Sequence, residues 1–212
     1  MQDFPKTDRN QVRRIAERGK YDRKTIYEIL DEGFLCHVGF CIENQPFVIP
    51  TLYARSGDSI FIHGSAVSRM LKNLSEGIEI CLTVTLVDGL VLARSAFNHS
   101  MNYRSAVVFG NGRLVEESGE KLAALKTISD NALPDRFDDS RAPTEKELKA
   151  TSVIRIEIEE ASAKIRSGDP IDDRKDYDSP FWAGVLPIET SFGKPIADSK
   201  LDETVELPDY LK

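Results

Sequence analysis

The spacing of apolar residues changes several times along the chain, and each change predicts an element. An apolar stripe follows Asp22, a good N-cap, and predicts a helix over 23–32 that ends at Gly33. After this helix the apolar spacing becomes that of β-strands, with turn residues between the segments. The expected strands cover 34–41, 45–53, 59–63, 78–86, 90–97, 103–116 and 152–166.

Further helices and turns are expected between these strands. The helices cover 66–76, 119–132 and a short segment that starts at Pro143. In the first of them, Val67, Leu71 and Leu74 should face inward. Turns are expected at 42–44, at 56–58 and at Asp88–Gly89, and the strand over 103–116 is expected to be bent or bulged at 110–112.

The order of these elements favours one architecture. Most strands follow one another through short turns, and the helices lie between or after strands without alternating with them. This predicts a mainly β, antiparallel barrel with appended helices, not a doubly wound sheet. Residues 1–21 read as a polar, basic arm, 22–166 as the barrel domain with its helices, and 167–212 as an extended tail. An apolar knot at 180–188 is expected to pack that tail on the barrel or on a dimer seam.

Composition narrows the function classes. The 212 residues are 41% hydrophobic and 30% charged, with a net charge of -7. An acidic globular chain of this kind is not expected to bind nucleic acid or an anionic membrane surface. No apolar run approaches the ~20 residues of a membrane span, and the charged N-terminus lacks the apolar core of a signal peptide. The three cysteines form no CxxC pair, which favours reduced thiols and a cytoplasmic location.

Metal binding is not expected. Cys36 and Cys41 have opposite parity on one strand, so their side chains should point to opposite faces. His37, between them, is expected to be a hydrogen-bonded core histidine. No other group of side chains has the spacing of a zinc site.

The stretch SIFIHGSAVSRMLKNL carries the candidate chemistry. Its strand ends at His63, Gly64 permits a tight turn, and Ser65 is expected to cap the next helix. Arg69 and Lys72, three residues apart, should share one helix face. Together these groups predict an anion site, most naturally for a phosphate. The alternative is a solvated basic turn in which Ser65 is only a cap.

Three stretches in a fixed order carry a resemblance to a known family. They are FVIPTLYARSGDSIFIHGSAVSRMLKNL, NYRSAVVFGNGRLVEE and WAGVLPI. The ordered set resembles the flavin-nucleotide-binding proteins of the pyridoxamine 5'-phosphate oxidase-like superfamily, in the branch that includes the nitroimidazole-resistance reductases. The resemblance implies an FMN-binding split β-barrel that forms a homodimer, with the cofactor in a groove at the dimer interface.

The resemblance also implies a set of cofactor-binding positions. They are Ser65, Arg69 and Lys72 at the phosphate, Pro50, Thr51 and Leu52 along the isoalloxazine edge, His63 and Gly64 near the ring or ribityl chain, Arg104 and Ser105 on a strand that reaches the cofactor, and Trp182 as a wall from the partner chain. His63 is in addition the candidate catalytic residue. For Trp182 the alternative is that it plugs the mouth of its own barrel.

The implied activity is flavin-dependent redox chemistry on a small organic substrate. This agrees with the lack of an acid–base pair or a nucleophile constellation in the sequence, because the flavin carries the reaction. The acidic end LDETVELPDYLK lacks the basic substrate-phosphate motif of the biosynthetic oxidase, which argues against pyridoxamine phosphate oxidation. The alternatives are a non-catalytic flavin-binding or carrier protein, or the same barrel with haem or a deazaflavin.

Overall fold

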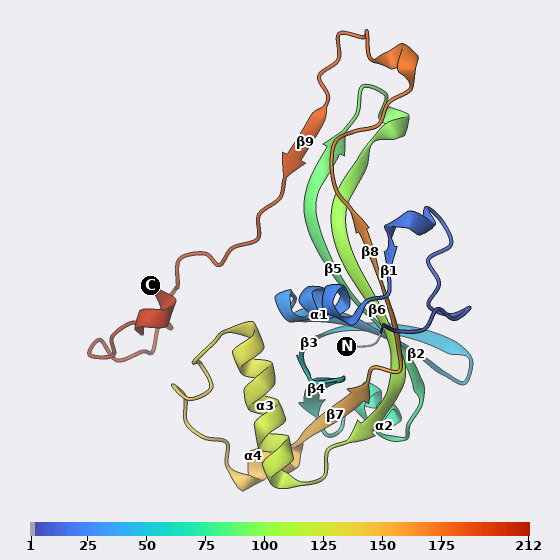
Figure 1. The fold of residues 1–212 in the computed structure, drawn as a ribbon. Helices are drawn as coiled ribbons and strands as arrows, with labels where there is room; N and C mark the ends of the chain where they lie inside the picture. The colour runs from blue at the N-terminus through green and yellow to red at the C-terminus, as the bar shows by residue number, and fades with distance from the viewer. Residues whose placement is uncertain (1–2) are drawn as a thin grey trace.

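Antiparallel pairing closes six strands into a ring. The computed structural model describes residues 3–212, whose strands form one nine-stranded sheet (Figure 1). Around the ring, β6 pairs with β7, then follow β4, β3, β2 and β5, which pairs with β6 again. The bounds are β2 Leu35–Ile42, β3 Gln45–Ser56, β4 Ser59–Ser65, β5 Glu79–Leu92, β6 Ser100–Leu114 and β7 Thr151–Glu157. The mainly β, antiparallel architecture predicted from the sequence is confirmed.

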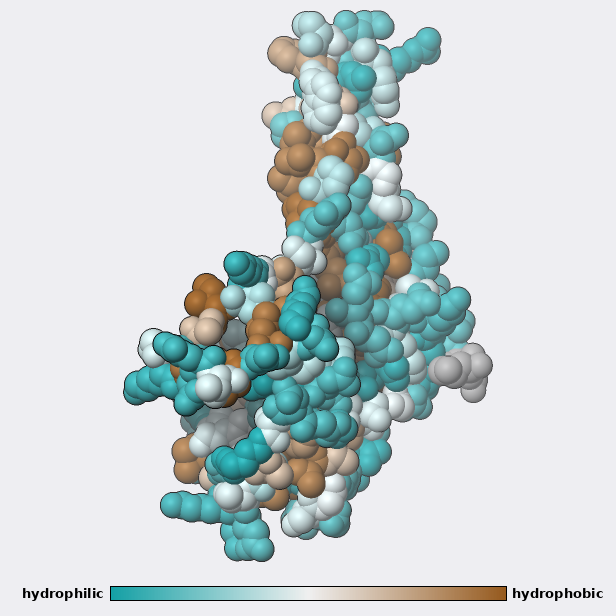
Figure 2. All heavy atoms as spheres, turned by 90° about the vertical axis from the view of Figure 1, so that its left-hand side faces the viewer, coloured by the Kyte–Doolittle hydropathy of each residue, from teal (hydrophilic) through white to brown (hydrophobic). Residues whose placement is uncertain are grey.

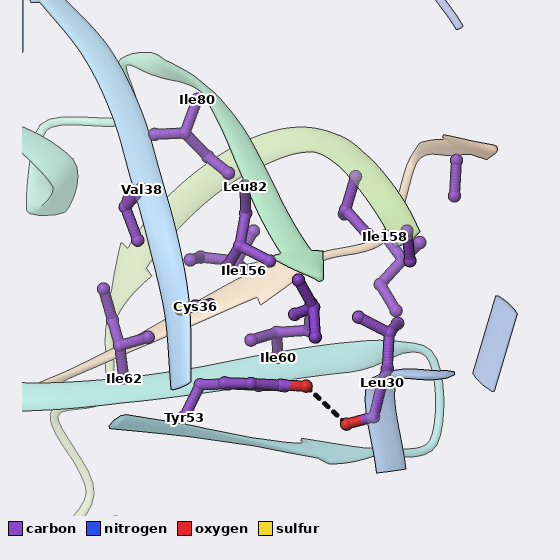
Figure 3. Packing of buried hydrophobic residues seen from close by; sticks show 14 of the residues in the cluster. Leu30, Cys36, Val38, Tyr53, Ile60, Ile62, Ile80, Leu82, Ile156 and Ile158 are labelled. Carbon is purple, nitrogen blue, oxygen red and sulfur yellow. Dashed lines mark hydrogen bonds between the residues drawn. The ribbon is translucent and has the colours of Figure 1, made fainter. Parts of the chain in front are cut away.

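The interior of the ring is the main hydrophobic core. Alternate residues of each strand point inward, so side chains such as Ile62, Leu82 and Ile154 are fully buried (Figure 3). Helix α1, Arg23–Glu32, closes one side with the apolar stripe that the sequence predicted, and Asp22 caps it by accepting from the Thr25 amide at 2.8 Å. The Tyr53 hydroxyl donates to the Leu30 carbonyl at 2.5 Å, which satisfies a buried polar group.

Strands β5 and β6 continue beyond the ring as a long arm (Figure 1). The prediction of a turn at Asp88–Gly89 is wrong, because β5 continues through these residues with a shift in its register against β6. The hairpin instead turns between Leu92 and Ser100, so the strand expected over 90–97 ends early. Gly89 permits the close approach of β9, Gly184–Pro187, since a Cβ there would lie 2.9 Å from the Leu186 carbonyl oxygen.

The strand expected over 152–166 is in fact two strands. β7 pairs with β4 and β6, whereas β8, Glu160–Arg166, pairs with β6 and with β1, Gly19–Lys20. Between them the Ile158 amide leaves the ladder and donates to the Asp58 carbonyl at 2.9 Å. At 110–112, where a bend or bulge was expected, the β5–β6 register has no bulge, and β6 changes its other partner from β8, up to Phe109, to β7, from Gly112. Gly110 serves a close approach instead, because a Cβ there would lie 2.1 Å from the Glu157 carbonyl oxygen.

Three further helices flank the ring. They are α2 Arg69–Ser75, α3 Ser118–Ala132 and α4 Glu145–Ala150. Helix α2 is shorter than expected, because Ser65 still belongs to β4 and Ser68 holds the N-cap position. Leu71 and Leu74 are buried as predicted, but Val67 is 77% exposed, so its inward assignment was wrong.

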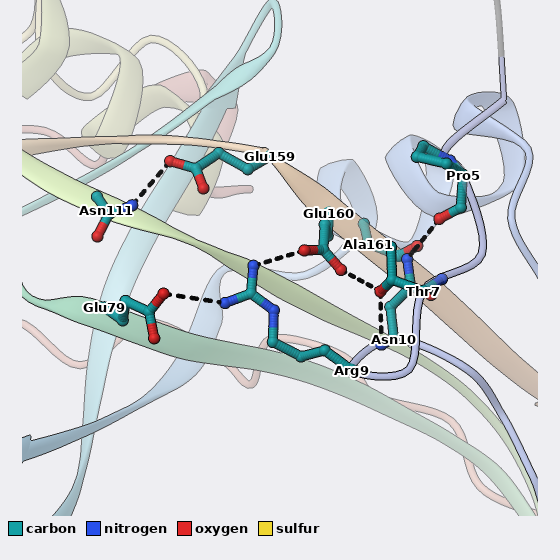
Figure 4. A network of polar contacts seen from close by, with 9 residues as sticks. All are labelled: Pro5, Thr7, Arg9, Asn10, Glu79, Asn111, Glu159, Glu160 and Ala161. Atoms are coloured by element: carbon teal, nitrogen blue, oxygen red, sulfur yellow. Dashed lines mark hydrogen bonds and ion pairs between the residues drawn. The ribbon is translucent and has the colours of Figure 1, made fainter.

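The N-terminal arm is ordered against the sheet (Figure 4). Its Arg9 guanidinium contacts Glu160 at 2.7 Å and Glu79 at 3.4 Å, and it lies over the Phe109 ring. The Asn10 side chain is buried and donates to the Ala161 carbonyl at 3.3 Å. The arm ends in the 3-10 turn η1, Ala16–Arg18, and strand β1. Within residues 3–212, no helix combines the length and the hydropathy that crossing a bilayer requires.

Candidate functional site

The ring is split where β3 changes partners. Tyr53 and Ile62 are the last pair that β3 forms with β4, and from Leu52 backwards β3 pairs with β2 instead. Leu52 and His63 therefore begin two diverging segments. Pro50 and Leu52 point to the outer face of the sheet and are exposed, while Thr51 is half-buried. The first predicted set, Pro50 to Leu52, thus lines the opening of the ring.

The second predicted set lies on the other side of this opening. His63, Gly64 and Ser65 form the end of β4, and Arg69 and Lys72 follow in α2. The Arg69 guanidinium lies 4.2 Å from the centroid of the Phe47 ring on β3, and neither cation pairs with a carboxylate within the described residues. The predicted cap is wrong, since the Ser65 hydroxyl only accepts from the Val67 amide at 3.4 Å. Two exposed cations and a hydroxyl are nevertheless grouped at one strand end.

His63 is the polar residue set deepest in this group. Its Nδ1 is buried and has no hydrogen-bond partner among the residues that the structure describes. Burial lowers the pKa of His63 below its usual value, so the imidazole is neutral near pH 7. A buried nitrogen without a partner costs about 1–3 kcal/mol, and a ligand that pairs with it would recover this free energy.

Arg104 on β6 is held by carboxylates of its own chain. Its guanidinium forms a two-pronged contact with Glu32 at the end of α1 and a 2.7 Å contact with Asp88 on β5. The hydrogen bonds to Glu32 and Asp88 raise the pKa of Arg104, and the hydrogen bond from Arg104 lowers the pKa of Glu32. Ser105 lies opposite Lys164 on β8. A contact of Arg104 or Ser105 with a cofactor stays a prediction, and the two carboxylate partners escaped the sequence reasoning because they are distant in the chain.

Trp182 does not plug its own barrel. It lies in the tail just before β9 and is 69% exposed. Its ring lies against Gly184, where a Cβ would come within 2.8 Å of the indole. That alternative was therefore wrong, and a seat for Trp182 against a partner chain stays a prediction.

The position of His37 differs from the one that the sequence predicted. It was expected in the core, but it is exposed on the outer face of β2, directly opposite Pro50 and Thr83 on the neighbouring strands. Cys36 is buried and Cys41 exposed, as their parity predicted, and burial raises the pKa of the Cys36 thiol to about 12. In residues 3–212 no three His, Cys, Asp or Glu side chains are grouped to hold a metal ion.

A basic cavity between the N-terminal arm and the sheet was missed by the sequence reasoning. It is lined by Arg14, Arg18 and Lys164, with His99 at its edge. The signal in the sequence was the basic run in the arm, RNQVRRIAERGK, whose side chains meet Lys164 only after β1 pairs with β8.

Comparisons with known proteins agree with this geometry. The flavocytochrome Anf3 from Azotobacter vinelandii is 40% identical, with a TM-score of 0.90 over 97% of this chain and 95% of that one. An FAD and heme binding protein from Mycobacterium smegmatis is 33% identical, with a TM-score of 0.86 over 91% of this chain and 95% of that one. A proposed 5-nitroimidazole antibiotic resistance protein from Bacteroides thetaiotaomicron is 22% identical (TM-score 0.58, 69% of this chain and 86% of that one) and shows the fold alone. No curated protein sequence matches the chain.

The family profile described as pyridoxamine 5'-phosphate oxidase matches residues 22–165, which span the whole ring. This match includes two of the three stretches that carry the resemblance, FVIPTLYARSGDSIFIHGSAVSRMLKNL and NYRSAVVFGNGRLVEE, whereas WAGVLPI lies beyond it. It confirms the recognition of the family. The chain therefore belongs to the pyridoxamine 5'-phosphate oxidase family.

Proposed function

We propose that this protein binds a flavin nucleotide and haem and transfers electrons between them, as a flavocytochrome. The observation that carries this proposal is the likeness to the Azotobacter vinelandii flavocytochrome at 40% identity over 97% of the chain. The Mycobacterium smegmatis neighbour, an FAD and heme binding protein by name, supports the same pair of cofactors. Both likenesses extend over the arm and much of the tail, outside the segment that the family profile matches.

The residues at the split in the ring fit a flavin phosphate. Arg69 and Lys72 are exposed cations without a carboxylate partner in residues 3–212, and Ser65 adds a hydroxyl beside them. Charge-assisted hydrogen bonds of this kind suit a phosphate dianion. FMN, expected from the sequence, and FAD both carry a phosphate at this position of the molecule. The exposed β3 segment at Pro50 and Leu52 would then lie along the isoalloxazine edge.

A bound flavin supplies the hydride and electron chemistry. The chain positions the ring, anchors the phosphate and limits access of water. His63, which is neutral because of its burial, contributes a buried Nδ1 without a partner in residues 3–212, at the end of β4 that leads to this site. We assign to His63 the orientation of the ring or of a small organic substrate through that nitrogen.

A haem iron needs a protein ligand, and the chain has three histidines. His99 donates its Nε2 proton to the Ala93 carbonyl at 3.1 Å, which leaves its Nδ1 lone pair for a metal. His63 has a nitrogen without a partner in residues 3–212, and His37 is exposed on the outer sheet face. All three are candidates for the iron ligand.

The proposal includes a homodimer with the flavin site at the interface. The outer face of β2 and β3 exposes Leu35, Val48 and Leu52 around the predicted ring-binding segment. Apolar surface of this extent on a functional face calls for a covering partner. A second copy would cover it and bring Trp182 within reach of the flavin. We place the dimer in the cytoplasm, in keeping with cysteines that form no disulfide in residues 3–212.

The test is the absorption spectrum of the purified protein, with and without dithionite. Flavin bands and a haem Soret band that shift on reduction would support the proposal, and a colourless protein that takes up neither cofactor would contradict it. His37→Ala, His63→Ala and His99→Ala then separate the three ligand candidates, because only loss of the iron ligand removes the Soret band of the native form.

The phosphate anchor has its own test. Arg69→Ala should weaken FMN about ten- to a hundredfold but leave riboflavin almost unchanged, because only FMN has the phosphate. Lys149→Ala, which removes an exposed cation in α4, is the matched control. Equal losses for FMN and riboflavin would show that Arg69 does not meet the phosphate.

A further inference from the structure

A second cationic site lies away from the split in the ring. A cavity of about 590 Å³ opens between the 3-10 turn of the N-terminal arm, β8 and the part of the β5–β6 arm that adjoins its hairpin turn. Arg14 and Arg18 reach it from the turn, and Lys164 reaches it from β8. The cations Arg69 and Lys72 belong to α2, a different element at the other end of the sheet (Figure 1).

The charges around this cavity are not balanced. None of Arg14, Arg18 and Lys164 forms an ion pair with a carboxylate in residues 3–212. Arg166, the next outward position on β8, is buried, and it donates to the carbonyls of Gly168 and Asp169. Burial and the nearby Arg18 lower the pKa of Arg166. Four cations are thus gathered in a protein whose net charge is -7, and a bound anion would reduce the repulsion between them.

The backbone of the turn is strained at the same place. Ile15, between Arg14 and the 3-10 turn, has φ 55 and ψ 62, the left-handed region. A β-branched residue rarely adopts this conformation, and strain of this kind clusters at binding sites. Here it places residues on both sides of Ile15, Arg14 and Arg18, at the rim of one cavity.

The opposite wall is apolar and aromatic. Leu90 on β5 lies directly across from Met101 on β6, and Tyr103 follows on the same face. A flat ring would pack against these side chains, while its charged part would face the arginines. The volume lies within the range of ligand pockets in proteins, roughly 300–1,000 Å³.

We propose that this cavity binds the diphosphate and adenosine of a dinucleotide. Arg14, Arg18 and Lys164 hold the diphosphate, since planar guanidinium groups suit its oxygens. Leu90, Met101 and Tyr103 hold the adenine. This inference rests on the proposed flavin-dependent redox function. The adenosine diphosphate group is that of a nicotinamide dinucleotide that serves the flavin as electron donor, because the phosphate that FAD shares with FMN is placed at Arg69 and Lys72, away from this cavity.

The experiment is a calorimetric titration of ADP into the full-length protein loaded with FMN. FMN has no adenosine, so the cavity is free for ADP under these conditions. We expect binding that Arg18→Gln and Lys164→Gln each weaken about tenfold to a hundredfold, the worth of one charge-assisted hydrogen bond. Lys149→Gln should bind ADP as the native protein does, and circular dichroism must show that every variant is folded.

Two further titrations test the source of the group. If it belongs to the donor, the Arg18→Gln variant loses affinity for NADH and keeps its affinity for FMN and FAD, which supports the site. If the variant loses affinity for FAD and keeps its affinity for NADH, the cavity does not bind the donor and the proposal is overturned.

Different binding results would contradict the proposed site and the proposed function. A protein that binds flavin but no ADP, or that binds ADP equally well in the native form and in both variants, overturns the site and leaves the flavin proposal intact. Loss of haem on Arg18→Gln substitution with unchanged ADP affinity also overturns it. A protein with neither flavin nor haem contradicts the proposed function before any ADP is added.

Discussion

Apolar side chains are buried in the ring but exposed in the tail. In the ring, isoleucines such as Ile62 and Ile156 are fully buried. In the tail, Trp182 and Ile196 are 69% and 96% exposed, and Figure 2 shows hydrophobic surface gathered along the arm that the tail follows. A ring closed on itself can bury every second side chain, whereas an extended segment on one edge covers little. The ring therefore carries its own stability, whereas the tail buries little apolar surface.

The tail is nevertheless placed by specific contacts. β9 adds four residues to the edge of β5, and further along Phe192 stacks on Phe34 with 6.3 Å between the ring centroids. Near its end the Tyr210 hydroxyl donates to Asp139 at 2.6 Å. Contacts this sparse contribute little to stability, so substitutions in the ring and in the tail should differ sharply.

The largest difference is expected between two isoleucines. Ile62→Ala removes a fully buried side chain and should lower the free energy of unfolding by about 2–5 kcal/mol. Ile196→Ala, at a 96% exposed position, should change it by less than about 0.5 kcal/mol. Urea titrations at one protein concentration measure both changes in the free energy of unfolding. Similar losses for the two variants would show that the ring and the tail do not differ in their contribution to stability.

One glycine in the ring and one in the tail allow the same comparison for the backbone. Gly110→Ala places a Cβ 2.1 Å from the Glu157 carbonyl oxygen and should cost about 1–3 kcal/mol, because β6 and β7 must move apart. Gly193→Ala in the tail meets nothing within 4 Å and should be neutral. If Gly110→Ala melts at the native temperature in calorimetry, the close crossing of these strands is not required.

His63 makes part of the stability of the ring depend on pH. Burial lowers its folded pKa, so below about pH 6.5 the unfolded chain binds a proton that the folded chain does not. The free energy of unfolding should therefore fall as the pH drops from 6.5 towards 5, by at most about 1.4 kcal/mol per pH unit. His63→Gln should flatten this fall, while His99→Gln at an exposed position should not. Parallel pH curves for the native protein and His63→Gln would rule out this role.

The smallest effect on stability is expected at Trp182. Trp182→Ala should leave the free energy of unfolding of the ring within about 0.5 kcal/mol of the native value, because the side chain is largely exposed. It should, however, weaken the dimer that we propose, which light scattering over a dilution series measures. Lys175→Ala, exposed in the same tail, is the control. A native-like dimer in the variant, together with Trp182 fluorescence of the native protein that bound flavin leaves unquenched, would place this residue away from the interface.

Much of the fold was predictable because local sequence patterns determine its helices and strands. The helix over 23–32 and most of the strands were found to within a few residues, since alternation and capping depend only on neighbours in the chain. The strand over 152–166 was misassigned for the same reason. Its apolar alternation passes through Ile158 without a break, and only the hydrogen bond to Asp58 marks the change of partner.

The candidate site was predictable in its parts but not in its contacts. His63, Arg69 and Lys72 are close in the chain, so one strand and one helix suffice to group them. Arg104 looked available in the sequence, but Glu32 and Asp88 come to it from two other elements. His37 looked like a core residue among apolar neighbours, but the register of β2 turns it outward.

By itself the sequence determined the alternation of the strands, the order of the motifs and, through that order, the family. Only the tertiary structure decided which distant residues meet. Arg14 and Arg18 join Lys164 because β1 pairs with β8, and the apolar wall opposite them exists because β5 and β6 run on together beyond the ring. The physical reason is that periodicity is set by near neighbours, whereas the meeting of side chains depends on strand register and on how the sheet closes.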